Sequence, residues 1–260
     1  MRKALALALG AGSASRTMAQ KVQGIFGGSL TGGMYLDADY GIVPSGSDVI
    51  AWTSWLGGIT AHRPAYYGKT GNAPTFNAAG MGSRATVDLV AASTQALILD
   101  GLASVYTGVN STKTWTTVAH MTHHMAANAY LISAGNSAAA NPYTAHGIAA
   151  DYDFRQVDDA AAAGHVTGPN VSKDVEHVVV WSKNGTAYSF WIDAVPFAGN
   201  PVAGAAIGQS TIDHVAIGAM YRNVDTWTSY ITTHLRRLVV IPDTITASQV
   251  AATQQIWYGT

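Results

Sequence analysis

The sequence predicts an all-β domain, built as an antiparallel sandwich or barrel. Short runs rich in β-branched and aromatic residues are separated by turn residues, and they do not alternate with helical stretches as in βαβ proteins. The clearest run reads EHVVVWSKNGTAYSFWIDAVPFA, residues 176–198, with Asn184-Gly185 at its centre. This dipeptide is typical of a two-residue hairpin turn. A chain of 260 residues, 48% of them hydrophobic, is long enough to bury a large core as one domain.

Two parts are expected along the chain. Residues 1–31 are rich in Ala, Gly and Ser, and their start, MRKALALALG, imitates a secretory signal. We expect them to form an extended N-terminal arm that another subunit anchors. Residues 32–260 form the expected domain. Its predicted strands are 34–36, 49–52, 85–89, 96–99, 114–123, 129–134, 146–151, 154–157, 175–182, 187–193, 214–219 and 230–241.

The hairpin at residues 176–198 is expected to be apolar on both faces. A two-residue turn at Asn184-Gly185 places Lys183 opposite Thr186 and Trp181 opposite Tyr188, on a side that should face the core. The other side, which includes Trp191, is too apolar to be fully exposed to solvent. It is therefore either covered within the same domain or a contact surface for a partner.

One helix is predicted, at the C-terminus, in ITASQVAATQQIWYG. Thr246 is its expected N-cap, and Gln249 completes a capping box. Ile245 and Val250 lie where a hydrophobic staple forms, and Gly259 ends the helix.

Five segments, in the same order, resemble the laminin-G-like modules of the concanavalin A-like lectin/glucanase superfamily. They read MYLDADYGIVPSGSDVIAWTSW, PTFNAAGMGSRATVDL, HVVVWSKNGTAYSFWIDAVPFA, TIDHVAIGAMYRN and HLRRLVVIPDTITASQVAATQQIWYG. The resemblance spans about residues 34–258 and implies a two-sheet antiparallel jelly roll. Asp193-Ala194 departs from the Asp-Gly that is common in the family, and the arm has no counterpart. Such modules occur in secreted bacterial proteins and in structural proteins of tailed bacteriophages.

Composition argues against several classes of function. Charged residues make up 11% of the chain, the formal net charge is −1, and no basic run exceeds Arg236-Arg237, so no nucleic-acid partner is expected. No apolar run approaches the roughly 20 residues of a membrane-spanning helix, so no membrane partner is expected. Cysteine is absent, which excludes disulfides and thiolate chemistry.

No catalytic site is expected. Most glycosidases need two carboxylates, yet Glu176 is the single glutamate of the chain. The Glu-x-Asp-x-x-Glu motif of the glucanases in the superfamily is absent, and so is a Gly-x-Ser-x-Gly nucleophile elbow. The sequence therefore predicts a protein that is not an enzyme.

No cofactor is expected either, although two groups of residues contain side chains that can bind metal ions. His120 and His124 would share one strand face while His123 points the other way, so we interpret this cluster as a surface or subunit interface and not as a zinc site. Paired aspartates could hold calcium, but such pairs more often cap backbone amides in turns. The pairs are Asp37/Asp39, Asp151/Asp153 and Asp158/Asp159.

Two functions fit these observations. The first is a structural protein of a tailed-phage particle, a head decoration or cement protein that contacts other virion proteins and copies of itself. The alternative is a glycan-binding, lectin-like module, used for host recognition or by a secreted bacterial protein, so the location is the virion or the extracellular space. The residues expected to contact a glycan or a partner are aromatic: Tyr66, Tyr67, Trp191, Tyr221 and Trp227.

Overall fold

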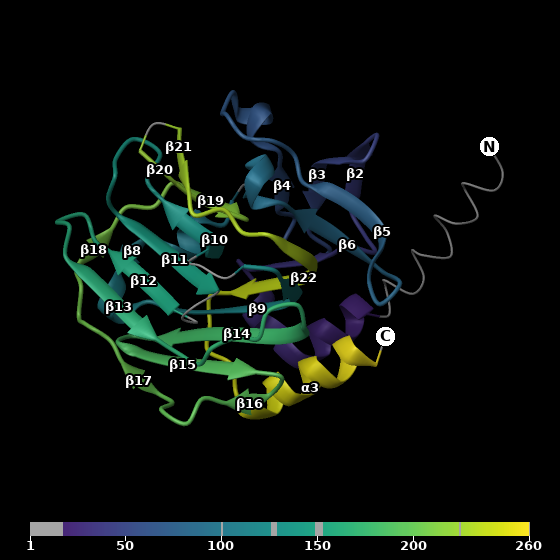
Figure 1. Cartoon of the computed structure of the whole chain (residues 1–260). Helices are drawn as coiled ribbons and strands as arrows, with labels where there is room; N and C mark the ends of the chain where they lie inside the picture. Colours follow the sequence, from purple (N-terminus) through teal and green to yellow (C-terminus); the bar gives the residue numbers. More distant parts are fainter. Residues whose placement is uncertain (1–17, 100, 126–128, 149–152, 224, 260) are drawn as a thin grey trace.

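Two antiparallel sheets, joined through the pairing of Asp48 with Thr75, face each other, and helices cover the outer face of one of them (Figure 1). The computed structural model describes residues 18–99, 101–125, 129–148, 153–223 and 225–259. The predicted two-sheet antiparallel sandwich with a C-terminal helix is confirmed.

The first sheet is built around four long neighbouring strands, β6 (Arg84–Leu89), β22 (Thr233–Ile241), β9 (Thr114–His123) and β14 (Glu176–Asn184). At one end β5 (Thr75–Met81) pairs with β6, and β1 (Met34–Asp37) runs along β22. At the other end β14 pairs with β15 (Ala187–Ile192), which is followed by the short strands β16 (Val195–Pro196) and β17 (Val202–Ala203).

The second sheet contains nine strands. Their order is β2 (Ile42–Ser45), β3 (Asp48–Thr53), β4 (Thr60–His62), β7 (Leu97–Leu99), β19 (His214–Ile217), β10 (Ala129–Gly135), β11 (Tyr143–Ile148), β12 (Asp153–Val157) and β13 (Ala163–Thr167).

Short elements complete the fold. Two small ribbons pair β8 (Gly108–Val109) with β18 (Gln209–Ser210) and β20 (Met220–Arg222) with β21 (Thr226–Thr228). The helical elements with defined bounds are η1 (Gly27–Leu30), η2 (Pro64–Tyr67), η3 (Ala91–Ser93), α2 (Ala103–Tyr106), η4 (Asn110–Thr112) and α3 (Ala247–Tyr258). None of the described helices is both long and apolar enough to cross a membrane.

The main core lies between the two sheets. Trp52 and Val215 from the second sheet and Trp115, Trp181 and Phe190 from the first sheet are fully or almost fully buried in one hydrophobic cluster. Because side chains alternate along a strand, the other face of the first sheet carries a separate set of apolar residues.

That other face is covered by the chain's own two ends. Residues 18–26 form a helix, and Val22 and Phe26 on it pack in one cluster with Trp257 of α3 and with Val180 and Trp191 of the hairpin. Figure 1 shows this helix beside α3 under the sheet. Residues 18–30 of the expected arm therefore pack against this domain. Residues 1–17 lie outside the described residues.

The hairpin register differs from the expected one by two residues. Asn184 pairs with Ala187 and Lys183 with Tyr188, so the turn residues are Gly185 and Thr186. Only the first of these has a positive φ, 61° at Gly185, which is the pattern of a type II′ turn. The pairing of β14 with β9 reaches Asn184, which keeps this residue in the strand. A shift of two leaves every side chain on its expected face.

The C-terminal helix begins as expected. The Gln249 amide donates to the hydroxyl of Thr246 (3.2 Å), and the Thr246 amide donates to the side-chain oxygen of Gln249 (2.9 Å), so the capping box is confirmed. The Gln249 side chain also donates to the carbonyl of Ile25 (2.9 Å) and so joins α3 to the N-terminal helix.

Candidate functional site

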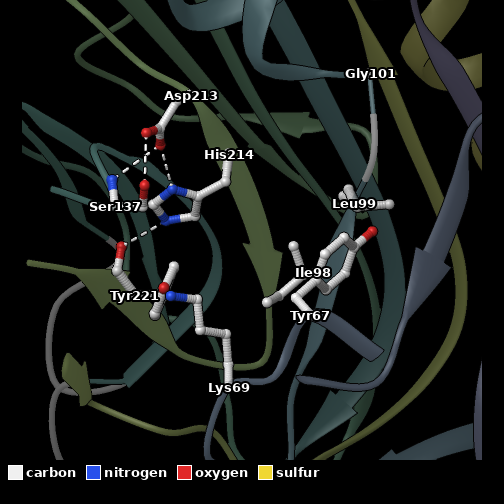
Figure 2. A pocket seen from close by; sticks show the side chains of 9 residues that line it. All are labelled: Tyr67, Lys69, Ile98, Leu99, Gly101, Ser137, Asp213, His214 and Tyr221. Atoms are coloured by element: carbon white, nitrogen blue, oxygen red, sulfur yellow. Dashed lines mark hydrogen bonds and ion pairs between the residues drawn. The ribbon is translucent and has the colours of Figure 1, made fainter. Parts of the chain in front are cut away.

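A pocket of about 250 Å³ opens where the segment after η2, the end of β7, the loop after β10 and the segment from β19 to β20 meet (Figure 2). Four separate stretches of the chain contribute to its wall. The lining residues are Tyr67, Lys69, Ile98, Leu99, Gly101, Ser137, Asp213, His214 and Tyr221.

The turn after η2 places two of these residues. Pro64 begins η2, where its fixed φ is compatible with a helical turn, and Gly68 ends it with φ 67°. Because glycine accepts this left-handed conformation without strain, the chain reverses there, and the Lys69 amide donates to the Pro64 carbonyl (3.1 Å). Tyr67 and Lys69 therefore both reach the pocket.

A hydrogen-bonded group fixes the opposite wall. Asp213 accepts from the amide (2.9 Å) and the hydroxyl (2.7 Å) of Ser137, and its Oδ1 lies 2.6 Å from Nδ1 of His214. Nε2 of His214 lies 2.9 Å from the carbonyl oxygen of Tyr221. Burial lowers the pKa of His214 despite these two acceptors. Burial raises the pKa of Asp213, but the hydrogen bonds from Ser137 and His214 outweigh it and hold the pKa below its usual value, so this carboxylate is ionised at neutral pH.

Lys69 supplies a polar atom with capacity left for a ligand, and the Tyr221 hydroxyl beneath it is unpaired among the described residues. The Lys69 ammonium lies 6.0 Å from the centre of the Tyr221 ring, and it forms no ion pair with any described residue. The Tyr221 hydroxyl is buried and has no hydrogen-bond partner among the described residues. Figure 2 shows the Lys69 side chain extending toward Tyr221 and His214.

Exposed and half-buried aromatic rings flank the pocket. Tyr66, 64% exposed, stacks on His62 with ring centres 4.0 Å apart and contacts Tyr67 edge-on at 5.0 Å. On the other side Trp227 packs against Tyr221 at 4.4 Å.

Asp225 joins the two sides of the pocket. It accepts from Nε1 of Trp227 (2.9 Å) and from the backbone amide of Thr70 (3.0 Å). The β20–β21 ribbon is thereby held against the segment that follows η2.

Four of the five predicted contact residues therefore gather in one region: Tyr66, Tyr67, Tyr221 and Trp227. The fifth, Trp191, is buried under α3 and the N-terminal helix, so its prediction as a contact residue is corrected. Sequence reasoning missed Lys69, Ser137 and the Asp213–His214 pair, because no local motif marks single polar residues that only the fold brings together.

The aspartates considered as calcium ligands have other partners. Asp37 accepts from Nε of Arg237 (3.1 Å) and from the hydroxyl of Tyr35 (2.5 Å), and Asp39 pairs with Arg236 (3.3 Å).

Asp158 accepts backbone amides at Ala160, Ala162 and Gly208, as expected of a turn aspartate, and Asp159 accepts from Thr211. Asp151 lies outside the described residues, and the side chain of Asp153 is not described. Among the described residues no group of three or more metal-ligating side chains forms a site.

The histidine cluster does not converge. Nε2 of His120 lies 2.6 Å from Glu176, Nε2 of His123 lies 3.1 Å from the carbonyl oxygen of Val171, and His124 pairs with Asp174. Each ring therefore serves a separate contact within the chain.

The fold is similar to that of domains that bind other molecules. No protein-family model matches the chain, and no curated protein does. The CBM40 domain of the Ruminococcus gnavus IT-sialidase, solved with α2,3-sialyllactose, is similar with a TM-score of 0.50 and 16% identity over 65% of this chain and 92% of that one. The binding domain of Paraclostridial Mosquitocidal Protein 1 is similar with a TM-score of 0.58 and 9% identity over 87% of this chain.

The chain spans about half, 52%, of the length of that toxin domain. At these identities the likeness concerns the fold alone. This chain accordingly has a β-sandwich fold that is also found in a carbohydrate-binding module and in a toxin binding domain.

Proposed function

We propose that this protein is a glycan-binding, lectin-like module and that the pocket beside η2 holds a sugar. The observation that carries the proposal is the composition of the pocket wall. Tyr67 contributes aromatic surface, the buried ring of Tyr221 lies behind the wall, and Lys69 and Ser137 contribute polar groups. Ligand sites commonly combine a mostly apolar lining with a few placed polar groups, and aromatic rings supply both apolar area and a polar edge.

The charge in the pocket favours an acidic sugar. Asp213 is already engaged by Ser137 and His214, whereas the Lys69 ammonium has no ion-pair partner among the described residues. A ligand carboxylate would complete that pairing. The similar R. gnavus domain was solved with a sialylated sugar, which makes sialyllactose the first ligand to test.

The comparisons favour this function over a structural role in a virus particle, because both similar domains are described as binding modules and neither as a virion protein. We further propose that the module acts outside a cell, on a phage surface or within a secreted bacterial protein. We propose in addition that the module contacts virion proteins or further copies of the chain. The glycan site does not depend on these contacts.

Calorimetric titration of the full chain with 3′-sialyllactose, 6′-sialyllactose and lactose tests the function. We expect saturable binding of a sialylated ligand that weakens at least tenfold in Lys69→Ala and in Tyr67→Ala. Lys21→Ala is the matched control, because Lys21 is exposed on the helix of residues 18–26. That helix lies beside α3, away from β20 and β21 (Figure 1).

Two results would overturn the proposal. One is the absence of binding to these sugars and to a broad glycan array. The other is glycan binding that neither pocket substitution changes.

A further inference from the structure

Two histidines from distant parts of the sequence meet at one end of the β9–β22 pair. The centres of the His124 and His234 rings are 4.8 Å apart, and the ring planes stand at 80°. His124 follows the last residue of β9, and its amide donates to the carbonyl of Thr232 (2.9 Å). His124 is thus the diagonal neighbour of His234 across the strand pair, within reach of an aromatic side chain.

Each of these imidazoles is held by its own carboxylate through Nδ1. His234 lies opposite Asp88 in the β22–β6 register, and the Nδ1 to Oδ1 distance is 2.7 Å. His124 makes the same contact with Asp174, also at 2.7 Å.

The Asp88 carboxylate is itself fixed, because it accepts from the side-chain amide of Asn77 (2.9 Å) and from the Thr86 hydroxyl (2.6 Å). The Asp174 backbone amide donates to the carbonyl of His123 (2.8 Å), and its exposed carboxylate also lies 3.9 Å from Nζ of Lys173. The orientation of the His234 ring is therefore set before any ligand arrives.

This arrangement determines which ring nitrogen is available. An ionised carboxylate only accepts hydrogen bonds, so Nδ1 of each neutral ring carries the hydrogen and Nε2 carries the free lone pair. Neither Nε2 has a hydrogen-bond partner among the described residues, and each side chain is 31% exposed. Two partly exposed imidazoles with ring centres 4.8 Å apart therefore each keep an Nε2 lone pair that no described residue uses.

We propose that His124 and His234 together bind one late first-row divalent cation, Zn²⁺, Ni²⁺ or Cu²⁺, through their two Nε2 atoms. A carboxylate on the far nitrogen is the usual support of a metal-binding histidine, and imidazole suits these three metals. With metal–nitrogen bonds of about 2.1 Å at a tetrahedral angle, two ring centres on one ion lie roughly 5 Å apart. The observed 4.8 Å agrees with this spacing. The remaining coordination positions go to water.

The test uses the untagged full chain, with Zn²⁺ followed by calorimetry and with substoichiometric Cu²⁺ followed by electron paramagnetic resonance. We expect one ion per chain, tighter binding of Cu²⁺ than of Zn²⁺, and a resonance spectrum that reports two coordinating nitrogens. His124→Gln and His234→Gln should each weaken binding at least tenfold and leave one nitrogen on copper.

Two further variants sharpen the assignment. Asp174→Asn should weaken binding about tenfold because it removes the charge that supports His124. Asn accepts the positive φ of position 174, which is 61°, so the backbone is conserved. His165→Gln, on β13, changes another exposed histidine and should have no effect.

Thermal melting of every variant without metal separates loss of ligands from loss of fold. The proposal is overturned by the absence of one-to-one binding in the wild type. It is also overturned if binding and the nitrogen count survive in either glutamine variant.

Discussion

The hydroxyl of Tyr258 donates a hydrogen bond to Asp193, with 2.5 Å between Oη and Oδ1, and so joins the last turn of α3 to the end of the β14–β15 hairpin. The same carboxylate accepts from the amide of Val178 (2.9 Å), and its Oδ2 lies 2.7 Å from Nδ1 of His177. Three separate donors therefore converge on one aspartate under the C-terminal helix.

We expect Asp193→Asn to lower the melting temperature at neutral pH and to flatten the acid side of the stability curve. Burial raises the pKa of Asp193, but the hydrogen bonds from His177, Tyr258 and Val178 outweigh it and hold the pKa below its usual value. A depressed carboxylate pKa stabilises the fold above the unfolded pKa of about 3.9, and this stabilisation is lost as the pH falls through the lower folded value. Melting curves from pH 2 to 7 test this, and parallel curves for the variant and the wild type would contradict it.

His146 should make the fold less stable in mild acid. It is fully buried against Trp115, with ring centres 4.6 Å apart, and neither ring nitrogen has a partner among the described residues. Burial lowers the pKa of His146 to about 3. The unfolded chain therefore takes up a proton from about pH 6.5 downward while the folded chain does not, which removes up to roughly 1.4 kcal/mol of stability per pH unit.

His146→Phe should remove the contribution of His146 to this pH dependence between pH 3 and 6.5 and leave that of the other buried histidines, such as His120, whose pKa burial lowers to about 4. The substitution abolishes no hydrogen bond among the described residues, so its cost at pH 7 is limited to accommodating the larger ring. Urea denaturation of both proteins at pH 4, 5, 6 and 7 measures the difference. If the free energies of unfolding of the variant and the wild type differ by the same amount at all four pH values, His146 is not the group responsible.

The N-terminal helix should be needed for stability. Phe26 is 3% exposed in the cluster that also contains Trp257 and Trp191. Phe26→Ala should cost about 3 kcal/mol, whereas Lys21→Ala, on the exposed side of the same helix, should cost little.

Deletion of residues 1–30 should lower the melting temperature sharply and cause association, because it uncovers the apolar face of the first sheet. Differential scanning calorimetry and light scattering check both effects. A truncated chain that melts like the full chain and stays monomeric would favour the interpretation of this segment as an arm for another subunit.

Tyr221→Phe should separate ligand binding from stability. The Tyr221 hydroxyl has no hydrogen-bond partner among the described residues, so its removal should leave the melting temperature unchanged or raise it slightly. If the hydroxyl binds the glycan, affinity should fall by about tenfold at the same time. A large drop in melting temperature would instead assign a structural role to this hydroxyl.

Local interactions explain which features could be predicted. The capping box of Thr246 and Gln249 involves neighbours in sequence, so it was found without the fold. The faces of the β14–β15 hairpin follow from the alternation of side chains along a strand. Its register depends also on β9, which ends some 50 residues earlier. Because β14 pairs with β9 as far as Asn184, the turn lies at Gly185-Thr186 and not at Asn184-Gly185.

The site was predictable only in part, for the same reason. Tyr67 and Tyr221 could be predicted because aromatic residues are conspicuous in segments that the sequence marks as loops and short ribbons, although Tyr221 is buried. Trp191 was misassigned because an apolar outer face indicates some cover, and the sequence did not reveal that the chain's own helices provide it. Lys69 and the Asp213–His214 pair become recognisable only when the fold brings their segments together.

The packing of residues 18–30 beside α3 also determines which way the pocket would face relative to a neighbouring domain. Figure 1 shows these helices at one end of the molecule and η2, β20 and β21 at the other. A domain joined after α3 would be tethered near the helices, so the pocket would lie at the end of the molecule that is far from that domain. If the pocket binds a glycan as proposed, several copies on one carrier would engage a glycan-coated surface at once, and avidity would compensate for a weak individual site.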